Sequence, residues 1–240
     1  MSDGIVIIPT YNEIENIESI IRAVFALPKS FHVLIVDDNS PDGTAQKVVE
    51  LQTEFSEKLF LEVRKKKSGL GTAYVHGFKW ALQRNYEFIF EMDADFSHNP
   101  KDLERLHEAC VNGADLAVGS RYVTGVNVVN WPLSRVLLSY FASVYVRMIT
   151  GMKIMDATAG FICYKKHVLE TINLDKIKFI GYAFQIEMKY RAFAKKFNIQ
   201  EVPVIFTDRT KGQSKMSGAI IKEAVFGVLS LRIKKFFNRL

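Results

Sequence analysis

The chain has 240 residues, a net charge of +6 at neutral pH, and 48% hydrophobic and 24% charged residues. These values exclude a largely disordered chain and fit one globular domain with a short appended segment. The positive charge suits an anionic partner such as nucleic acid, a nucleotide or an acidic membrane surface. Cys110 and Cys163 lack the spacing of a metal site or a disulfide framework, which favours a reduced, intracellular protein. We expect no signal peptide and no membrane-spanning helix, because no apolar run approaches the roughly 20 residues that such a helix needs.

The first half of the chain alternates short aliphatic runs with amphipathic segments. This alternation predicts an α/β fold with a mostly parallel central sheet and helices on both faces. The expected strands are residues 5–8, 32–36, 59–63, 88–92 and 116–119. One expected helix begins near residue 12, and three others cover residues 44–55, 71–83 and 100–111.

The second half is less regular. Residues 132–149 and 219–239 have the pattern of amphipathic helices. Between them we expect strands near residues 159–164 and 199–206 and a helix near residues 182–197.

Two aspartates, Asp93 and Asp95, come directly after the apolar run at residues 88–92. In parallel sheets, ligands bind beyond the carboxyl ends of the strands, and this pair lies at such an end. Carboxylate oxygens suit Mg²⁺ or Mn²⁺, and such an ion could bridge to a diphosphate. An isolated Asp-x-Asp is also common in solvated loops, so its position among other strand ends carries the hypothesis.

A second acidic pair, Asp37 and Asp38, follows the strand predicted at residues 32–36. The rest of that segment, up to Thr44, is rich in turn-forming residues, and Asp42 or Thr44 could cap the next helix. Turn formation does not explain Asp37 and Asp38. Carboxylates at this position can accept hydrogen bonds from the base or ribose of a nucleotide.

Six segments together resemble a known family. "IPTYNE", "VDDNSPDGT", "MDADFSH", "GSRY", "DATAGF" and "DRTKGQSK" occur in the order and register of the dolichol-phosphate mannose synthases. These enzymes are family 2 glycosyltransferases with the A-type glycosyltransferase fold, and the resemblance covers about residues 5–217. It implies transfer of mannose from GDP-mannose to a polyprenyl monophosphate with inversion, giving polyprenyl-phosphate β-mannose.

The resemblance also implies roles for individual residues. The guanosine would contact Pro9, Tyr11, Glu13, Val36 and Asp38; the diphosphate and a Mg²⁺ or Mn²⁺ ion would meet Asp93, Ala94 and Asp95; Arg121 and Arg135 would hold the acceptor phosphate; and Arg209 and Lys215 would hold the donor diphosphate. Ser97 stands at a metal-ligand position where many relatives carry Gln, and it is the poorer ligand. His98 is more typical of a structural residue than of a ligand.

The chemistry agrees with this assignment. A phosphate monoester is anionic near neutral pH, so the nucleophile needs no catalytic base, and the sequence shows no obvious His–carboxylate pair. The reaction needs cations that hold two anionic groups together, and the planar fork of Arg suits phosphate. Two alternatives stay open: Arg135 could only flank an interfacial helix, and residues 207–218 could be a solvated loop rather than a lid over the diphosphate.

A polyprenyl acceptor requires contact with a membrane. We expect a monotopic, peripheral protein on the cytoplasmic face. Its catalytic domain would cover residues 1–217, including an interfacial helix near residues 132–150, and an amphipathic membrane-interface helix would cover residues 218–240. The alternative is that both helices pack against the domain. The last helix carries an apolar stripe (Val225, Leu229, Ile233, Phe236 and Phe237) edged by Arg232, Lys234, Lys235 and Arg239, and the earlier helix a stripe of Leu133, Leu137, Tyr140, Phe141, Val144 and Met148.

Two other functions compete with this one. Glucose or another hexose could be transferred to polyprenyl phosphate, since neither sugar nor base follows from spacing. A non-catalytic nucleotide- and membrane-binding module is a second alternative, although it would not need all of these site residues. We expect no nucleic-acid partner, because the cations are not interleaved with aromatics in a recognisable motif. A membrane-protein partner is compatible with the sequence.

Overall fold

The computed structural model describes residues 2–181, 183–208 and 218–236. Among these residues, seven strands form one sheet in the order β3-β2-β1-β4-β7-β5-β8. All neighbouring strands are parallel except β7, which is antiparallel to β4 and β5. The strands are β1 (Gly4–Thr10), β2 (His32–Asp37), β3 (Leu59–Val63), β4 (Phe88–Glu91), β5 (Leu116–Ser120), β7 (Ile162–Lys165) and β8 (Ile199–Pro203).

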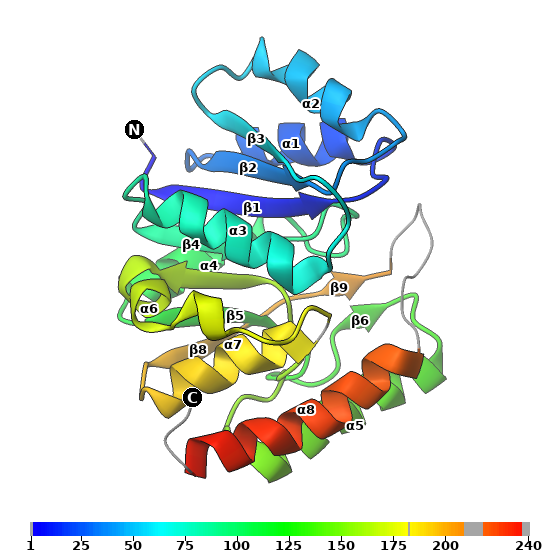
Figure 1. Cartoon of the computed structure of the whole chain (residues 1–240), viewed down its shortest axis with the longest axis vertical. Helices are drawn as coiled ribbons and strands as arrows, with labels where there is room; N and C mark the ends of the chain where they lie inside the picture. Colours follow the sequence, from blue (N-terminus) through cyan, green and yellow to red (C-terminus); the bar gives the residue numbers. More distant parts are fainter. Residues whose placement is uncertain (1, 182, 209–217, 237–240) are drawn as a thin grey trace.

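Helices cover both faces of this sheet, which confirms the predicted α/β architecture (Figure 1). One face packs against α1 (Ile17–Phe25), α2 (Thr44–Gln52) and α4 (Asp102–Val111). The other face packs against α3 (Leu70–Leu82), α6 (Lys166–Thr171) and α7 (Ala183–Ala194), and a short 3₁₀ helix at Leu174–Lys176 follows α6. The aliphatic strands are buried on both faces, as expected for a sheet between two helical layers.

Two long helices, α5 (Leu133–Thr150) and α8 (Gly218–Phe236), lie side by side along one edge of the molecule (Figure 1). Val146 of α5 and Val228 and Leu231 of α8 pack into a third apolar cluster with Ile186 and Tyr190 of α7. The Tyr145 hydroxyl of α5 also donates a hydrogen bond to the Val225 carbonyl of α8, at 3.0 Å. One face of each helix therefore belongs to the protein core.

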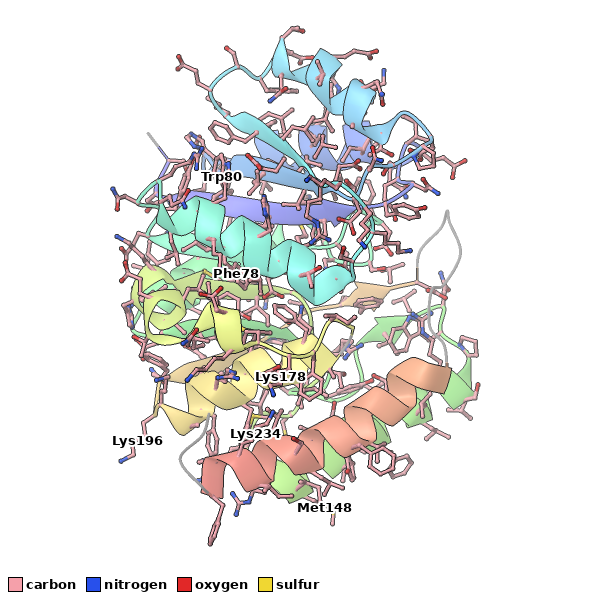
Figure 2. All side chains as sticks on the ribbon, in the orientation of Figure 1. Phe78, Trp80, Met148, Lys178, Lys196 and Lys234 are labelled. Carbon is pink, nitrogen blue, oxygen red and sulfur yellow. The ribbon has the colours of Figure 1, made fainter. Side chains whose placement is uncertain are left out.

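The opposite face of this helix pair is apolar and exposed. Met148 points away from the body of the molecule and is 79% exposed (Figure 2). Among the residues whose burial is described, Leu133, Leu137, Leu138 and Phe141 of α5 and Val225, Phe226, Leu229, Ile233 and Phe236 of α8 are also exposed. In the described part of the chain, no helix is both long enough and apolar enough to cross a membrane.

The expected strand at residues 199–206 is wrong as a single element. It divides into β8 and β9 (Phe206–Thr207), and β9 pairs with β6 (Val128–Val129) in a separate two-stranded sheet. Pro203, the last residue of β8, has no N–H with which to continue a ladder. The break brings Phe206 next to the loop before α5, where the candidate site lies.

Candidate active site

The turn after β4 is held by its own side chains. The Asp95 carboxylate accepts a hydrogen bond from the Ser97 backbone N–H at 3.1 Å, and both residues are buried. The Asp93 backbone N–H donates to Nδ1 of His98 at 3.3 Å. The Asp93 carboxylate accepts a long hydrogen bond from the Tyr74 hydroxyl, at 3.5 Å, and lines a cavity. The predicted acidic pair therefore lies at the carboxyl end of β4, in a turn with a defined shape.

His98 positions this turn. Its ring stacks on Phe161 with centroids 4.8 Å apart, and burial lowers the pKa of His98 to about 4. The ring is therefore neutral near pH 7, and its Nδ1 already accepts the Asp93 N–H. This agrees with the structural role expected from the sequence.

The oxygen atoms of the turn fit a hard divalent cation. Asp93 and Asp95 provide carboxylates and Ser97 a hydroxyl, the donor types that Mg²⁺ and Mn²⁺ prefer. Within the described ranges, no group of three or more His, Cys, Asp or Glu side chains could hold a metal ion. Mg²⁺ usually completes its shell with water and substrate phosphate, so two carboxylates beside a diphosphate are a sufficient protein contribution.

The acidic residues after β2 have different environments. Asp37 is fully buried and accepts hydrogen bonds from the Thr10 hydroxyl at 2.8 Å and from the Ser40 backbone N–H and hydroxyl at 2.8 and 2.6 Å. It therefore shapes the turn, and the expectation that turn formation does not explain Asp37 is wrong. Asp38 accepts from Nε of Arg64 at 2.5 Å. Arg64 is thus a residue of this edge that the sequence reasoning missed, because nothing in its local pattern identifies its partner.

The remaining residues expected at the nucleotide lie at the same edge or in the core beneath it. Tyr11 follows β1, and the Lys67 ammonium lies 4.2 Å from the centroid of its ring. The Glu13 backbone N–H donates to the Thr44 hydroxyl at 3.0 Å, which joins the loops after β1 and β2. The Val36 side chain is fully buried in the core, so a ligand could reach only its backbone. Pro9 ends the buried run of β1 and is partly exposed.

Arg121 follows β5 and is buried against Asp156. Its Nε and Nη2 atoms each donate to one carboxylate oxygen of Asp156 at 2.6 Å, and Nη2 also donates to the Thr158 hydroxyl at 2.8 Å. Burial alone would raise the pKa of Asp156, but the charge and hydrogen bonds of Arg121 outweigh burial and hold this pKa below its ordinary value. Arg121 is therefore a fixed, charge-compensated group.

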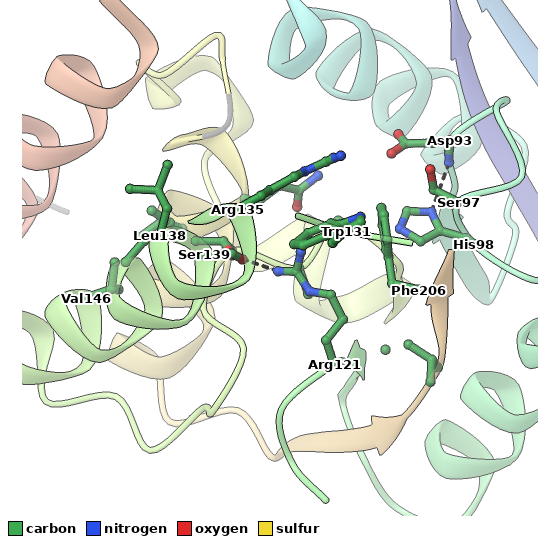
Figure 3. A pocket seen from close by; sticks show the side chains of 18 of the residues that line it. Asp93, Ser97, His98, Arg121, Trp131, Arg135, Leu138, Ser139, Val146 and Phe206 are labelled. Atoms are coloured by element: carbon green, nitrogen blue, oxygen red, sulfur yellow. Dashed lines mark hydrogen bonds between the residues drawn. The ribbon is translucent and has the colours of Figure 1, made fainter. Parts of the chain in front are cut away.

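Arg135 lies in the first turn of α5 and is less buried. Its Nη1 donates to Asp208 at 2.7 Å, and each of the two side chains is about one quarter exposed. Its guanidinium carbon lies 4.1 Å from the ring centroid of Trp131. Both predicted phosphate-binding arginines thus have an aspartate partner, and Trp131 lies between them (Figure 3).

A cavity of about 390 Å³ joins these groups (Figure 3). Its carboxylate end contains Asp93, Ser97 and His98, and its arginine end contains Arg121, Trp131, Arg135 and Phe206. Its apolar end lies at the pair α5 and α8, and includes Leu138, Phe141, Ala142, Tyr145, Val146 and Val225. Asp93, Ser97, Arg121 and Arg135 are therefore brought together, whereas Tyr11 and Asp38 do not line this cavity.

A buried polar network borders the cavity and was missed in the sequence. Glu91 accepts hydrogen bonds from Nε2 of Gln185 at 2.5 Å and from the Tyr164 hydroxyl at 2.9 Å, and burial raises the pKa of Glu91 to about 8. Lys189 donates to the Ala159 carbonyl at 2.5 Å, and burial lowers its pKa to about 8. These residues stand in strands and helices whose patterns look apolar, so only the fold shows that they meet.

Some expected site residues lie outside the described residues. These are Arg209 and Lys215 of the segment after β9, and Phe237 and Arg239 of the C-terminal stripe.

Comparisons with known proteins point to one group of enzymes. Residues 5–172 match the family model described as glycosyl transferase family 2. The chain is 46% identical, over 98% of its own length and 89% of the relative's, to a polyprenol monophosphomannose synthase of Mycolicibacterium smegmatis.

Two solved structures share the fold at low sequence identity. A glucosyl-3-phosphoglycerate synthase from Mycobacterium tuberculosis, in complex with Mn²⁺, UDP and glucosyl-3-phosphoglycerate, aligns with a TM-score of 0.68 at 14% identity, over 97% of this chain and 79% of that one. A mannosyltransferase from Pyrobaculum calidifontis, in complex with GDP-Man and Mn²⁺, aligns with a TM-score of 0.57 at 15% identity, over 99% and 72% of the two chains.

Proposed function

The chain belongs to glycosyl transferase family 2, and from this membership we propose that it transfers mannose from GDP-mannose to a polyprenyl monophosphate with inversion, giving polyprenyl-phosphate β-mannose. It has the A-type glycosyltransferase fold expected from its motifs. The name of its 46% identical relative supports both the sugar and the class of acceptor. GDP-mannose as the donor rests on the resemblance in sequence and on the GDP-Man complex of one protein with the same fold.

The observation that carries the proposal is the order of chemical environments along the cavity. The Asp93 carboxylate, the two arginines and the apolar side chains follow one another from the turn after β4 to the helix pair α5 and α8 (Figure 3). A lipid monophosphate has the matching order of groups, because its phosphate must meet the donor at one end while its hydrocarbon chain continues at the other. A water-soluble acceptor would have no use for the apolar end.

The donor would bind at the carboxyl ends of β1, β2 and β4. The guanosine would contact Pro9, Tyr11, Glu13, Asp38 and the backbone of Val36. Mg²⁺ or Mn²⁺ would be held against the diphosphate by Asp93 and Asp95. Ala94 would lie beside the diphosphate, and Ser97 would be a further oxygen donor. Arg209 and Lys215 would contact the diphosphate from the opposite side. A divalent ion bound there supplies positive charge that stabilises the departing diphosphate.

The acceptor phosphate would bind between Arg121 and Arg135. Within the described structure, Nη1 of Arg121 makes no hydrogen bond, so it is the atom with which this fixed arginine would contact phosphate. A phosphate monoester is already anionic near neutral pH and needs no base. This suits a site whose nearby imidazole, that of His98, is a weak base, because burial lowers its pKa to about 4 and its Nδ1 already accepts the Asp93 N–H. Attack on the face of the sugar opposite the diphosphate would invert the anomeric centre.

The membrane would lie against the exposed apolar face of α5 and α8. Apolar side chains there could enter the acyl boundary, and Arg232 could meet anionic headgroups. Lys235 has a different environment from the one expected, because its ammonium lies 4.5 Å from the ring centroid of Phe193 and 5.4 Å from that of Tyr190. We propose that residues 1–217 form the catalytic part and residues 218–240 the membrane-interface part, and that the protein lies on the cytoplasmic face of the membrane.

The test is a donor panel with the purified protein. GDP-mannose, GDP-glucose, UDP-glucose and UDP-N-acetylglucosamine are each supplied with a short polyprenyl phosphate and Mg²⁺ or Mn²⁺, and products are identified by mass spectrometry and by NMR of the anomeric proton. We expect a β-mannosyl phosphate from GDP-mannose and no comparable product from the other donors.

Other outcomes would select a different function. Faster transfer from a different nucleotide sugar would replace mannose by that sugar. Nucleotide binding without any product, in all metal and acceptor combinations, would favour a non-catalytic nucleotide- and membrane-binding module.

A further inference from the structure

Trp131 occupies the space between the two arginines of the cavity (Figure 3). The guanidinium carbon of Arg135 lies 4.1 Å from its ring centroid, and that of Arg121 lies 5.5 Å away. The Phe206 ring meets the Trp131 ring edge-on, with centroids 5.1 Å apart. The electron-rich face of an indole attracts cations, so the ring holds two like charges near each other that would otherwise repel.

The indole nitrogen of Trp131 has no partner. Its Nε1 atom is buried and forms no hydrogen bond with the described residues, although Trp131 itself lines the cavity. Leaving a buried N–H unsatisfied is unfavourable, and most such groups in folded proteins have a partner. An orphan donor beside two guanidinium groups therefore indicates a missing acceptor.

The second tryptophan of the chain shows the usual arrangement. Trp80 also has a guanidinium over its ring, that of Arg84 at 3.6 Å, but its Nε1 donates to the Glu62 carboxylate at 3.0 Å. Both rings thus carry a cation, yet only Trp80 finds a carboxylate for its N–H within the described structure. The two indole N–H groups therefore differ in hydrogen bonding because of their surroundings, since Trp131 lines the cavity.

We propose that the indole N–H of Trp131 donates a hydrogen bond to the phosphate of the prenyl acceptor, beside the contacts of Arg121 and Arg135. This inference rests on the proposed function. An indole donates and never accepts, and it carries no charge, so it favours an anionic oxygen without adding to the repulsion between the arginines. The added donor matters because Asp156 and Asp208 already offset the charges of both arginines.

The ligand is an anion and not a sugar hydroxyl because of what surrounds the nitrogen. Two guanidinium groups lie over the same ring, and positive charge favours an oxygen with a full negative charge over a neutral hydroxyl. Since Nε1 is covered by neighbouring side chains, one of them must move before phosphate reaches it. Of the two guanidinium groups that contact the ring, that of Arg135 is the less firmly held, because its pair with Asp208 is partly exposed whereas Arg121 is buried with Asp156.

The direct test is the NMR signal of the indole N–H groups. The chain has two tryptophans, so a ¹⁵N-labelled sample gives two indole cross-peaks, which Trp131→Phe and Trp80→Phe assign. Farnesyl phosphate is titrated in the presence of Mg²⁺ and GDP, with farnesol as the uncharged control of the same chain length. We expect the Trp131 proton to move downfield with the phosphate and not with the alcohol, while the Trp80 signal stays in place.

Kinetics provide a second, independent readout. Trp131→Phe keeps an aromatic ring for both guanidinium groups and removes only the N–H, whereas Trp80→Phe removes an N–H that already has a partner. We expect Trp131→Phe to raise the KM for the prenyl phosphate about tenfold, the lower end of the effect of losing one hydrogen bond to a charged group, and to leave the affinity for GDP-mannose unchanged. Trp80→Phe should leave both constants unchanged.

Three results would overturn the inference. The first is a Trp131 signal that does not move while the wild-type protein converts the same prenyl phosphate to product, which would leave the proposed function intact. The second is an unchanged acceptor KM in Trp131→Phe. The third is an equal loss of donor and acceptor affinity in that variant, which would make Trp131 a structural residue. A wild-type protein that glycosylates no prenyl phosphate would instead remove the proposed function itself, and this inference with it.

Discussion

The carboxylate end and the arginine end of the cavity are constructed in different ways. At the carboxylate end, Asp93, Ser97 and His98 come from one turn of six residues, and two hydrogen bonds within the turn help to shape it. At the arginine end, Arg121, Trp131 and Arg135 come from separate segments, and their aspartate partners are 35 and 73 residues away along the chain. The residues of the carboxylate end are thus neighbours in the chain, whereas those of the arginine end are held by pairs that join distant segments.

The two arginines also differ from each other, in how deeply their ion pairs are buried. Arg121 is buried with Asp156, so its position is fixed and its charge is compensated. Arg135 shares a half-buried pair with Asp208, the residue just before the segment that carries Arg209. We interpret Arg121 as the static part of the acceptor site and Arg135 as the part that can exchange an aspartate for a phosphate.

The largest effect should come from breaking the buried pair. Asp156→Asn should lower the free energy of unfolding by about 3–5 kcal/mol, because it leaves the buried Arg121 guanidinium without a countercharge. Asp208→Asn is the matched control, because the partly exposed pair contributes at most about 1 kcal/mol. Urea unfolding of both variants measures the difference, and equal losses would contradict the distinction between the two arginines.

The same pair predicts a pH dependence of stability. Because the folded-state pKa of Asp156 is lowered, its stabilisation is complete above the ordinary carboxyl pKa and is lost as the pH falls through the folded-state value. Asp156→Asn should therefore lack one component of acid destabilisation that the wild-type protein shows. Urea midpoints between neutral and acidic pH would detect it, and parallel curves for the two proteins would speak against it.

The next effect concerns the carboxylate end. Asp95→Asn should lower kcat at least about 100-fold, because the bound divalent ion contributes several kcal/mol of charge stabilisation, while the circular dichroism spectrum stays unchanged. Asp93→Asn should have a smaller effect, because we expect Asp95 to be the main metal carboxylate and Asp93 a supporting one. Asp175→Asn, which removes an exposed carboxylate, is the control for net charge. Full activity of Asp95→Asn, or of the wild-type protein in excess chelator, would rule out the metal role.

A smaller effect is expected at Arg135. Arg135→Ala should weaken use of the prenyl phosphate by about 1.5–3 kcal/mol and leave GDP-mannose binding unchanged, because one charge-assisted contact is lost. Asp208→Asn should leave the acceptor KM equal or lower, since it removes a competitor for the same guanidinium. Steady-state kinetics with each substrate varied in turn separate these outcomes.

Arg121→Ala should also impair the acceptor step. This variant does not separate acceptor binding from stability, however, because it leaves the buried Asp156 carboxylate unpaired and so destabilises the fold as well. If either arginine variant lost nucleotide affinity and kept its acceptor kinetics, the donor and acceptor assignments would have to be exchanged.

The smallest effects are expected on the exposed apolar face of α5 and α8, which we propose contacts the membrane. Removing residues from 218 onward would not test attachment alone, because Val228 and Leu231 belong to the core and Gly227 packs against Phe179. Ile233→Ser is a cleaner change and should weaken binding to anionic vesicles by about 1 kcal/mol, since it removes part of the apolar contact. Val111→Ser is the control, because both side chains are 58% exposed and Val111 lies on α4.

Vesicle co-sedimentation at low and high salt measures this attachment. Salt should weaken it, because basic residues near an anionic surface contribute about 1 kcal/mol each at low ionic strength. Equal effects of the two serine variants would place the contact away from α8, and a wild-type protein that never sediments with vesicles would remove the membrane hypothesis.

Several features of this protein follow from the sequence by itself. The five expected strands of the first half are present at nearly the expected bounds, and so is the turn with Asp93 and Asp95 at the end of β4. Aliphatic runs between turn-forming residues are local signals, and a motif of adjacent residues stays together however the chain folds. The amphipathic patterns of α5 and α8 also predicted both helices, although not that they lie side by side.

Only the tertiary structure decided how the arginine end of the cavity is assembled. The antiparallel position of β7 between β4 and β5, the division of residues 199–206 into two strands, and the pairs Arg121–Asp156 and Arg135–Asp208 join segments far apart in the chain. Strand periodicity shows which face of a strand is buried but not the direction of its neighbour, and a carboxylate carries no local mark of the arginine that it will meet. Asp156 lies within a recognised motif, yet its role became visible only when the fold placed it against Arg121.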